Sequence, residues 1–224
     1  MRNTRLASIA LAFVTVGLVL TAPVTAQVIP SLHPSLRGVL AAGWQRYIMS
    51  IPASVNPTLD LTGANALIGQ SGPLYYLAGS GSTEPVTRTV TLPPGKFLFY
   101  PLVTVECSTV EAAPFFGSNY PQLSQCAGSF FAPSDVLTCT IDGVPVAGLQ
   151  GTRAQSPLYR FQMPAQDNIL GLPGVTGGLS VTDGYWMLLA PLSTGQHVIH
   201  FTALLTTGIG AGFTQDVTYN LTVL

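Results

Sequence analysis

The stretch V-T-R-T-V-T-L-P-P-G-K-F-L-F-Y-P-L-V-T-V (86–105) decides the fold. Its first part alternates, with threonines on one face of the expected strand and the other face carrying Val86, Arg88, Val90 and Leu92. Pro93-Pro94-Gly95 then turns the chain, because proline and glycine interrupt regular structure. Residues 96–105 follow as a second strand that is apolar on both faces. The stretch therefore predicts two consecutive strands.

Turn signals and alternation continue to the C-terminus. Residues 136–141 alternate, and the following Asp142-Gly143 fits the two positive-φ positions of a type I′ hairpin turn. Asp183-Gly184 predicts a second turn of this kind, before a strand over residues 185–190. Further strands are expected over 196–205 and 217–224. In the last of these the inward residues are Val217, Tyr219, Leu221 and Val223.

About nine short strands separated by Gly/Pro turns are typical of an all-β chain folded as an antiparallel β-sandwich, Ig-like or jelly-roll-like. One N-terminal amphipathic helix is expected over residues 34–51, where apolar side chains recur at steps of three and four. This apolar stripe consists of Leu36, Val39, Leu40, Trp44, Tyr47, Ile48 and Ile51. Residues 107–135 are expected to form a long loop.

Residues 1–26 are typical of a secretory signal peptide. Two arginines precede an apolar stretch (6–20), and small residues lie before Gln27, which fits cleavage after Ala26. The apolar stretch is shorter than the roughly 20 residues of a membrane-spanning helix. We therefore expect one domain over 27–224 that is secreted, extracellular or periplasmic, with no membrane span in the mature chain.

The composition excludes several classes of protein. Hydrophobic residues make up 47% of the chain and charged residues 8%, which excludes a disordered chain and a coiled coil. Of 8 Lys and Arg, two lie in the leader, so six remain against 9 Asp and Glu. So weak a charge predicts no nucleic-acid partner. It favours a neutral ligand, and no cofactor motif is present.

Three cysteines remain for an oxidising compartment, where one bridge and one leftover thiol are expected. Cys139 lies on the apolar face of the strand over 136–141 and is expected to be buried as a free thiol. Cys107 and Cys126 flank the long loop, so a bridge between them is favoured. A Cys126–Cys139 bridge is the alternative, and it would contradict that strand.

The chain resembles a family of secreted bacterial β-rich proteins with no assigned function. The resemblance covers nearly the whole mature chain and is carried by G-Q-S-G-P-L-Y-Y-L-A-G (69–79), P-G-K-F-L-F-Y-P (94–101), E-C-S (106–108), P-F-F-G (114–117), D-G-Y-W (183–186) and P-L-S-T-G-Q-H-V-I-H-F (191–201). It implies a secreted β-rich domain with a Cys107–Cys126 bridge. It implies no catalytic residue.

The sequence contains only weak signals for catalysis and metal binding. Ser71 lies in G-Q-S-G-P, but Pro73 replaces the second glycine of a nucleophile elbow, so a tight turn is the simpler interpretation. His197 and His200 are three apart in a strand and point to opposite faces, so they cannot share one metal ion. We expect His200 to be a hydrogen-bonded core histidine, and no metal site is predicted.

Glu106 ends the apolar run L-V-T-V-E and is the acid that most needs a partner. A buried, unpaired carboxylate is costly, so a structural hydrogen bond is expected, with Arg88, Arg160 or His200 as the candidate partner. No second carboxylate is expected beside it, which leaves paired-acid glycosidase chemistry incomplete.

Adjacent aromatic pairs complete the candidate site residues. Tyr75-Tyr76 and Tyr185-Trp186 lie in expected strands, so one member of each pair must face outward or toward the helix over 34–51. An outward-facing ring would stack on a sugar ring, and the alternative is that the helix and the long loop cover these faces. We therefore expect a secreted, non-catalytic protein that binds a neutral ligand, a glycan or a protein. The alternatives are a secreted hydrolase using Ser71, Glu106 and His200, and a self-assembling surface or structural protein whose strand edges pair.

Overall fold

The computed structural model describes residues 28–29 and 32–224, and the expected signal peptide lies outside this part of the chain. Helices are α1 (Pro34–Ser50) and α2 (Tyr120–Gly128), with short 3-10 turns η1 (Ala53–Val55) and η2 (Leu149–Thr152). The strands are β1 (Leu74–Tyr76), β2 (Val86–Leu92), β3 (Phe97–Ser108), β4 (Val136–Ile141), β5 (Val144–Pro145), β6 (Arg153–Gln155), β7 (Tyr159–Gln162), β8 (Gly177–Leu189), β9 (Gly195–Leu204) and β10 (Thr214–Val223). The protein is mainly β, as predicted.

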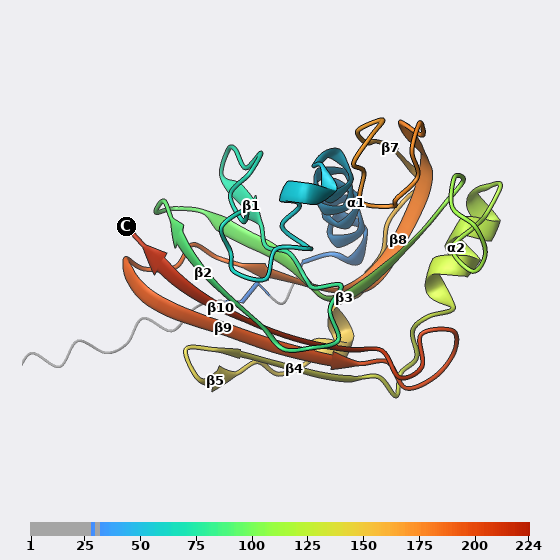
Figure 1. The fold of residues 1–224 in the computed structure, drawn as a ribbon. Coiled ribbons are helices and arrows are strands. Elements are labelled where there is room, and N and C mark those ends of the chain that lie inside the picture. The colour runs from blue at the N-terminus through green and yellow to red at the C-terminus, as the bar shows by residue number, and fades with distance from the viewer. Residues whose placement is uncertain (1–27, 30–31) are drawn as a thin grey trace, which may run out of the picture.

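The strands form two five-stranded sheets that lie in separate layers (Figure 1). The first sheet has the order β1-β3-β8-β6, with β7 also paired to β8, and the second has the order β2-β10-β9-β4-β5. Most pairs are antiparallel, but β1 pairs with β3 and β2 with β10 in parallel. The expected antiparallel pairing therefore holds for most of the two sheets, and the edge strands β1 and β2 are parallel exceptions.

One hydrophobic core fills the space between the sheets, and α1 covers the other face of the first sheet (Figure 1). The predicted inward residues Val217, Tyr219, Leu221 and Val223 all belong to this core. On the helix side, Trp44 packs edge-on against Trp186, which stacks on Phe99. The first sheet is thus covered on both faces, which explains why residues 96–105 are apolar on both sides.

The buried face of α1 differs from the predicted stripe. Leu36 and Val39 are 49% and 52% exposed, whereas Gly38 and the alanines 41 and 42 are buried. A side chain at Gly38 would begin 2.3 Å from the backbone oxygen of Gln155. Small residues therefore allow the helix to lie close to β6, and this close approach determines which face is buried.

Two further expectations were wrong. Residues 107–135 contain the helix α2, whose first turn is capped by Asn119, with the backbone N–H of Gln122 donating to its side chain over 3.1 Å. Asp183-Gly184 is no turn but lies inside β8, between β3 and β6. There Arg153 pairs with the Asp183 carboxylate at 3.0 Å, and glycine is required because a Cβ at 184 would meet a backbone oxygen of β3.

Other local predictions are confirmed. Asp142 and Gly143 both have positive φ and connect β4 to β5. Cys107 and Cys126 form a disulfide that ties β3 to α2, while Cys139 is a buried free thiol. Among the described residues, no helix has both the length and the apolar character needed to cross a membrane.

The free thiol provides a direct test of the core. Burial raises the pKa of Cys139 to about 11, and the reactive species of a thiol is the thiolate. We expect iodoacetamide at pH 8 to leave Cys139 unmodified in the native protein and to modify it completely in guanidinium chloride. Mass spectrometry of the intact chain measures the difference, and rapid labelling of the native protein would contradict the packing of β4.

Candidate functional site

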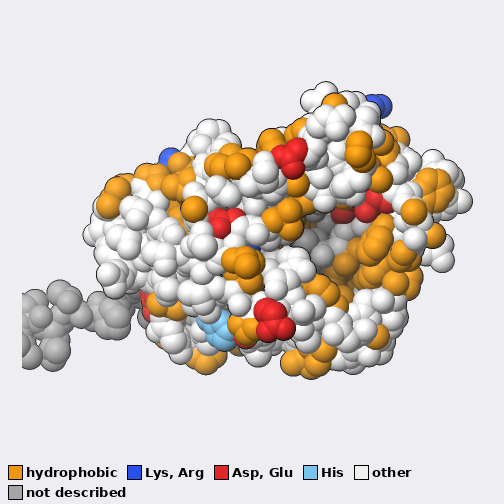
Figure 2. Space-filling view, viewed as in Figure 1, with side chains coloured by type: hydrophobic (Ala, Val, Ile, Leu, Met, Phe, Trp, Pro, Cys, Tyr) orange, Lys and Arg blue, Asp and Glu red, His pale blue; other side chains and the backbone are white. Residues whose placement is uncertain are grey.

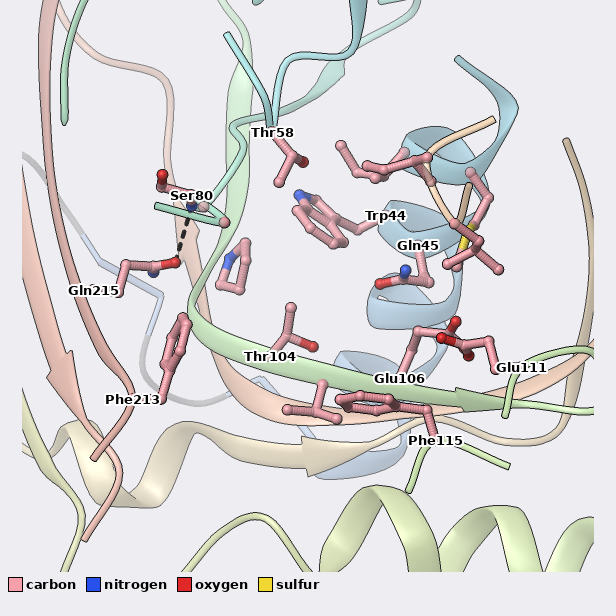
Figure 3. A pocket seen from close by; sticks show the side chains of 18 residues that line it. Trp44, Gln45, Thr58, Ser80, Thr104, Glu106, Glu111, Phe115, Phe213 and Gln215 are labelled. Carbon is pink, nitrogen blue, oxygen red and sulfur yellow. Dashed lines mark hydrogen bonds between the residues drawn. The ribbon is translucent and has the colours of Figure 1, made fainter. Parts of the chain in front are cut away.

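A cavity of about 280 Å³ opens between α1, β3 and the loops that carry residues 58, 79–81, 111–115, 169–170 and 213 (Figure 3). Its apolar wall includes Trp44, Ile48, Met49, Phe115, Leu170 and Phe213. Its polar lining includes Gln45, Thr58, Ser80, Thr104, Glu106, Glu111 and Gln215. Cavities of this kind, mostly apolar with a few convergent polar groups, are the usual form of a small-molecule site.

Glu106 lies on the face of the first sheet that α1 covers. In the β3–β8 register it is opposite Thr182, and Ser108 is opposite Ser180. The Ser180 hydroxyl donates a hydrogen bond to Glu106 Oε2. It also lies 2.9 Å from the hydroxyl of the buried Tyr159. The partner of Glu106 is therefore a hydroxyl network, and none of the predicted candidates Arg88, Arg160 and His200.

A second carboxyl group lies beside the first, contrary to expectation. The carboxyl of Glu111 lies close enough to Glu106 to raise the pKa of Glu106, and Ser108 Oγ donates to Glu111 Oε2 over 2.8 Å. Although residue 106 as a whole is partly exposed, its Oε1 is buried and receives no donor from the described residues. Ionised carboxylates only accept hydrogen bonds. The proximity of a second carboxyl group therefore favours the protonated form of Glu106 over two adjacent negative charges.

The surroundings favour that proton. Burial raises the pKa of Glu106 well above its usual value, and the neighbouring Glu111 raises it further, while the Ser180 hydrogen bond opposes the change. Burial also raises the pKa of Tyr159, and the adjacent Glu106 adds to the effect. The network thus holds a proton at pH values where an exposed glutamate is ionised.

Thr58 adds a second unsatisfied group to the same cavity. Its Oγ1 is buried and has no hydrogen-bond partner among the described residues. Figure 3 shows its side chain on the opposite side of the cavity from Glu106 and Glu111, next to Trp44. Buried polar atoms are nearly always hydrogen-bonded. Two such orphan atoms, Thr58 Oγ1 and Glu106 Oε1, thus line one cavity.

The loop walls of the cavity are held by Arg88, which is fully buried. Its guanidinium donates to the carbonyls of Asp60, Ala78 and Gly79 over 2.7–3.0 Å. It also donates to the Tyr219 hydroxyl over 2.8 Å and lies over the Tyr219 ring. Arg88 therefore fixes two wall segments, the one after Thr58 and the one at Gly79, without touching a carboxylate in these contacts.

A second hollow of about 340 Å³ adjoins the first, and the two share Thr104, Val105, Phe115 and Phe213. Its remaining lining is apolar or glycine: Val103, Phe130, Leu205, Ile209, Gly210 and Ala211. Figure 2 shows the hollowed face, with hydrophobic surface along its wall and acidic atoms near its edge. Together the hollows form a groove that is polar at one end and apolar at the other.

The predicted Ser71, Glu106 and His200 are not brought together. Ser71 is exposed in the turn before β1 of the first sheet. His200 lies on the outer face of the second sheet, where its Nε2 contacts Asp216 at 2.9 Å. The expectation of a core histidine was wrong for His200, and the buried histidine is His197 instead. The strand register decided this, because a shift by one residue exchanges the faces.

The predicted aromatic platform is mostly buried. Tyr185 and Trp186 are 1% and 0% exposed, so neither can stack on a sugar ring. Both are covered because β8 is central in the first sheet, between the inter-sheet core and α1. Tyr75 and Tyr76 are half-buried, with Lys96 over the ring of Tyr75 and Tyr47 against that of Tyr76. None of the four lines the cavity.

Sequence reasoning missed Glu111, Thr58 and Gln45. Glu111 reaches Glu106 because the chain reverses after β3, with the Ser108 N–H donating to the Phe115 carbonyl over 2.9 Å. The single available signal was Gln45, a polar residue next to Trp44 on the buried side of α1. Within the described part of the chain, no group of three or more His, Cys, Asp or Glu side chains could hold a metal ion.

No protein-family model matches the chain, and no curated protein matches it in sequence. Among solved structures, the cysteine protease inhibitor EhICP2 from Entamoeba histolytica is similar with 11% identity and a TM-score of 0.26, over 67% of this chain and 96% of that one. PbICP-C in complex with falcipain-2 has 11% identity and a TM-score of 0.26, over 68% and 100%. Amebosin is similar with 12% identity and a TM-score of 0.24, over 69% of this chain and 100% of that one. Similarities this low carry no argument about function.

Proposed function

We propose that the protein is a non-catalytic binding protein, active outside the cytoplasm, that holds a small molecule with an apolar body and a polar end. One observation carries this proposal. The two orphan atoms, Thr58 Oγ1 and Glu106 Oε1, line the same aromatic-walled cavity. A ligand that satisfies them would offset the cost of leaving buried polar atoms unpaired.

The extracytoplasmic location is supported by the Cys107–Cys126 bridge, because disulfides persist in oxidising compartments. Three earlier expectations stay predictions: a signal peptide over 1–26, secretion, and a single Ig-like or jelly-roll-like domain over 27–224. The groove favours a small molecule over the expected glycan or protein ligand, since Tyr185 and Trp186 present no exposed platform.

The two alternatives lead to different measurements. A hydrolase using Ser71, Glu106 and His200 would need a rearrangement that brings the three side chains together. In the structure Ser71 lies in an exposed turn and His200 lies on the outer face of the second sheet. A self-assembling protein would form oligomers in analytical ultracentrifugation, and it would need no molecule in the cavity. Binding of a small apolar probe therefore separates our proposal from both.

The probe is N-phenyl-1-naphthylamine, a neutral fluorophore whose emission rises in apolar surroundings. We expect its fluorescence to increase on addition of the full chain, and Gly81→Phe to reduce the binding at least tenfold. Gly81 lines the cavity, and a Cβ at this position meets no atom within 4 Å, so the ring narrows the opening without disturbing the fold.

Gly151→Phe is the matched control. Gly151 has the same free space around an added Cβ but does not line the cavity. The control should bind the probe as the unaltered protein does. Absence of binding by the unaltered protein, or equal binding by the Gly81 variant, would contradict the proposal.

A further inference from the structure

We propose that the polar end of the cavity, which Glu106 and Glu111 line, binds an organic ammonium group. This inference rests on the proposed binding function and names the chemical class of the ligand. It departs from the neutral ligand that the composition favoured, because folding concentrates two of the chain's few acids at one place.

The charge of the cavity selects a cation. Its described lining contains Glu106 and Glu111 and no Lys, Arg or His. Ion pairs among the described residues use other acids, namely Asp142, Asp183 and Asp216. No cationic side chain of the described lining therefore neutralises these two acids, in surroundings where charges interact strongly. A cationic group would supply the missing countercharge.

The hydrogen-bonding groups also fit an ammonium. Glu106 Oε1 is a buried acceptor without a donor, and the donors nearby, Ser180 and Ser108, already serve Oε2 of Glu106 and of Glu111. An ammonium has several donors and no acceptor. It can bridge both carboxylates and supply the hydrogen bond that Oε1 lacks.

The apolar walls suit the rest of such a ligand. The rings of Trp44, Phe115 and Phe213 line the cavity and can attract a cation through their faces. Phe115 and Phe213 continue into the apolar hollow. An alkyl or aryl chain extending from the ammonium along the groove would therefore remove apolar surface from water.

Binding must be linked to one proton. Burial and the neighbouring Glu111 raise the pKa of Glu106, so Glu106 holds a proton in the free cavity. When the ammonium binds as the countercharge, Glu106 ionises and releases that proton to solvent. The other titratable or charged groups facing this network are Tyr159, through Ser180, and Arg46, which lies over the Tyr159 ring. Neither lies in the cavity lining. The affinity should therefore rise with pH, at most tenfold per unit, until Glu106 of the free protein has lost its proton.

The test compares n-hexylammonium with its uncharged counterpart 1-hexanol, by calorimetry on the full chain at pH 5 to 8. At pH 8 we expect n-hexylammonium to bind at least tenfold more tightly than 1-hexanol. At pH 5 its binding should release a proton, so the measured heat of binding should depend on the ionisation heat of the buffer. Glu111→Gln should reduce the preference for the ammonium at least tenfold, and Glu84→Gln, a change of an exposed acid, should not.

Three results would overturn the inference: equal binding of the alcohol, an affinity independent of pH, or tight binding of Ca²⁺ alone with the same proton release. If N-phenyl-1-naphthylamine binds but the ammonium shows no preference, this inference fails and the proposed function stands. If the naphthylamine does not bind, the proposed function itself fails.

Discussion

Replacing Arg88 with methionine should lower the free energy of unfolding by about 3–5 kcal/mol. Methionine fills similar space but removes every donor, which leaves the carbonyls of Asp60 and Gly79 without their Arg88 partner, while the Ala78 carbonyl keeps only the Tyr219 hydroxyl. The Tyr219 hydroxyl also loses a donor. Each unsatisfied buried group costs roughly 1–3 kcal/mol, and hydrogen bonds from a charged donor are at the strong end. Urea denaturation followed by circular dichroism measures the loss.

Arg160→Met is the control, because Arg160 is an exposed residue of β7 and its side chain makes none of these contacts. Its stability should change by no more than about 0.5 kcal/mol. Arg88→Lys should lie between the two, since a lysine keeps the charge but lacks the planar fork that reaches several carbonyls. Equal stability of all three variants would show that the walls do not depend on Arg88.

Arg88 also shows how far the sequence determines this fold. Strand alternation placed Arg88 on the same face as Val86, Val90 and Leu92, and the structure buries all four. Alternation is a property of neighbouring residues, so strands such as β2 and β10 can be predicted locally. It does not say which distant carbonyls will surround the guanidinium, and those contacts determine whether a buried charge is stable.

The candidate site could be predicted less well. Glu106 stood out because a carboxylate ends an apolar strand, but Glu111 depends on the chain reversal after β3, which local patterns do not reveal. Thr58 is placed by a loop that Arg88 holds from another strand. A short motif can also mislead: Asp183-Gly184 has the composition of a turn, yet pairing with β3 and β6 and the ion pair to Arg153 keep it in β8.

The raised pKa of Glu106 leads to the second large effect, a pH-dependent gain of stability in Glu106→Gln. The folded protein raises the pKa of Glu106, by burial and by the nearby Glu111. The folded state therefore binds more protons than the unfolded state at intermediate pH. Stability from this group is fully present below the usual glutamate pKa and is lost as the pH rises through the higher pKa of the folded protein.

Glutamine is uncharged, keeps the shape, and can donate its amide N–H to Glu111, so it replaces the proton. At pH 4 the variant should have nearly the stability of the unaltered protein, and at pH 8 it should be more stable by about 1–3 kcal/mol, the usual cost of an unsatisfied buried group. Urea denaturation at both pH values measures this, with Glu84→Gln as a control that should show no such difference. If Glu106→Gln is instead less stable at both pH values, Glu106 acts as an ordinary structural acceptor and holds no proton for a ligand to displace.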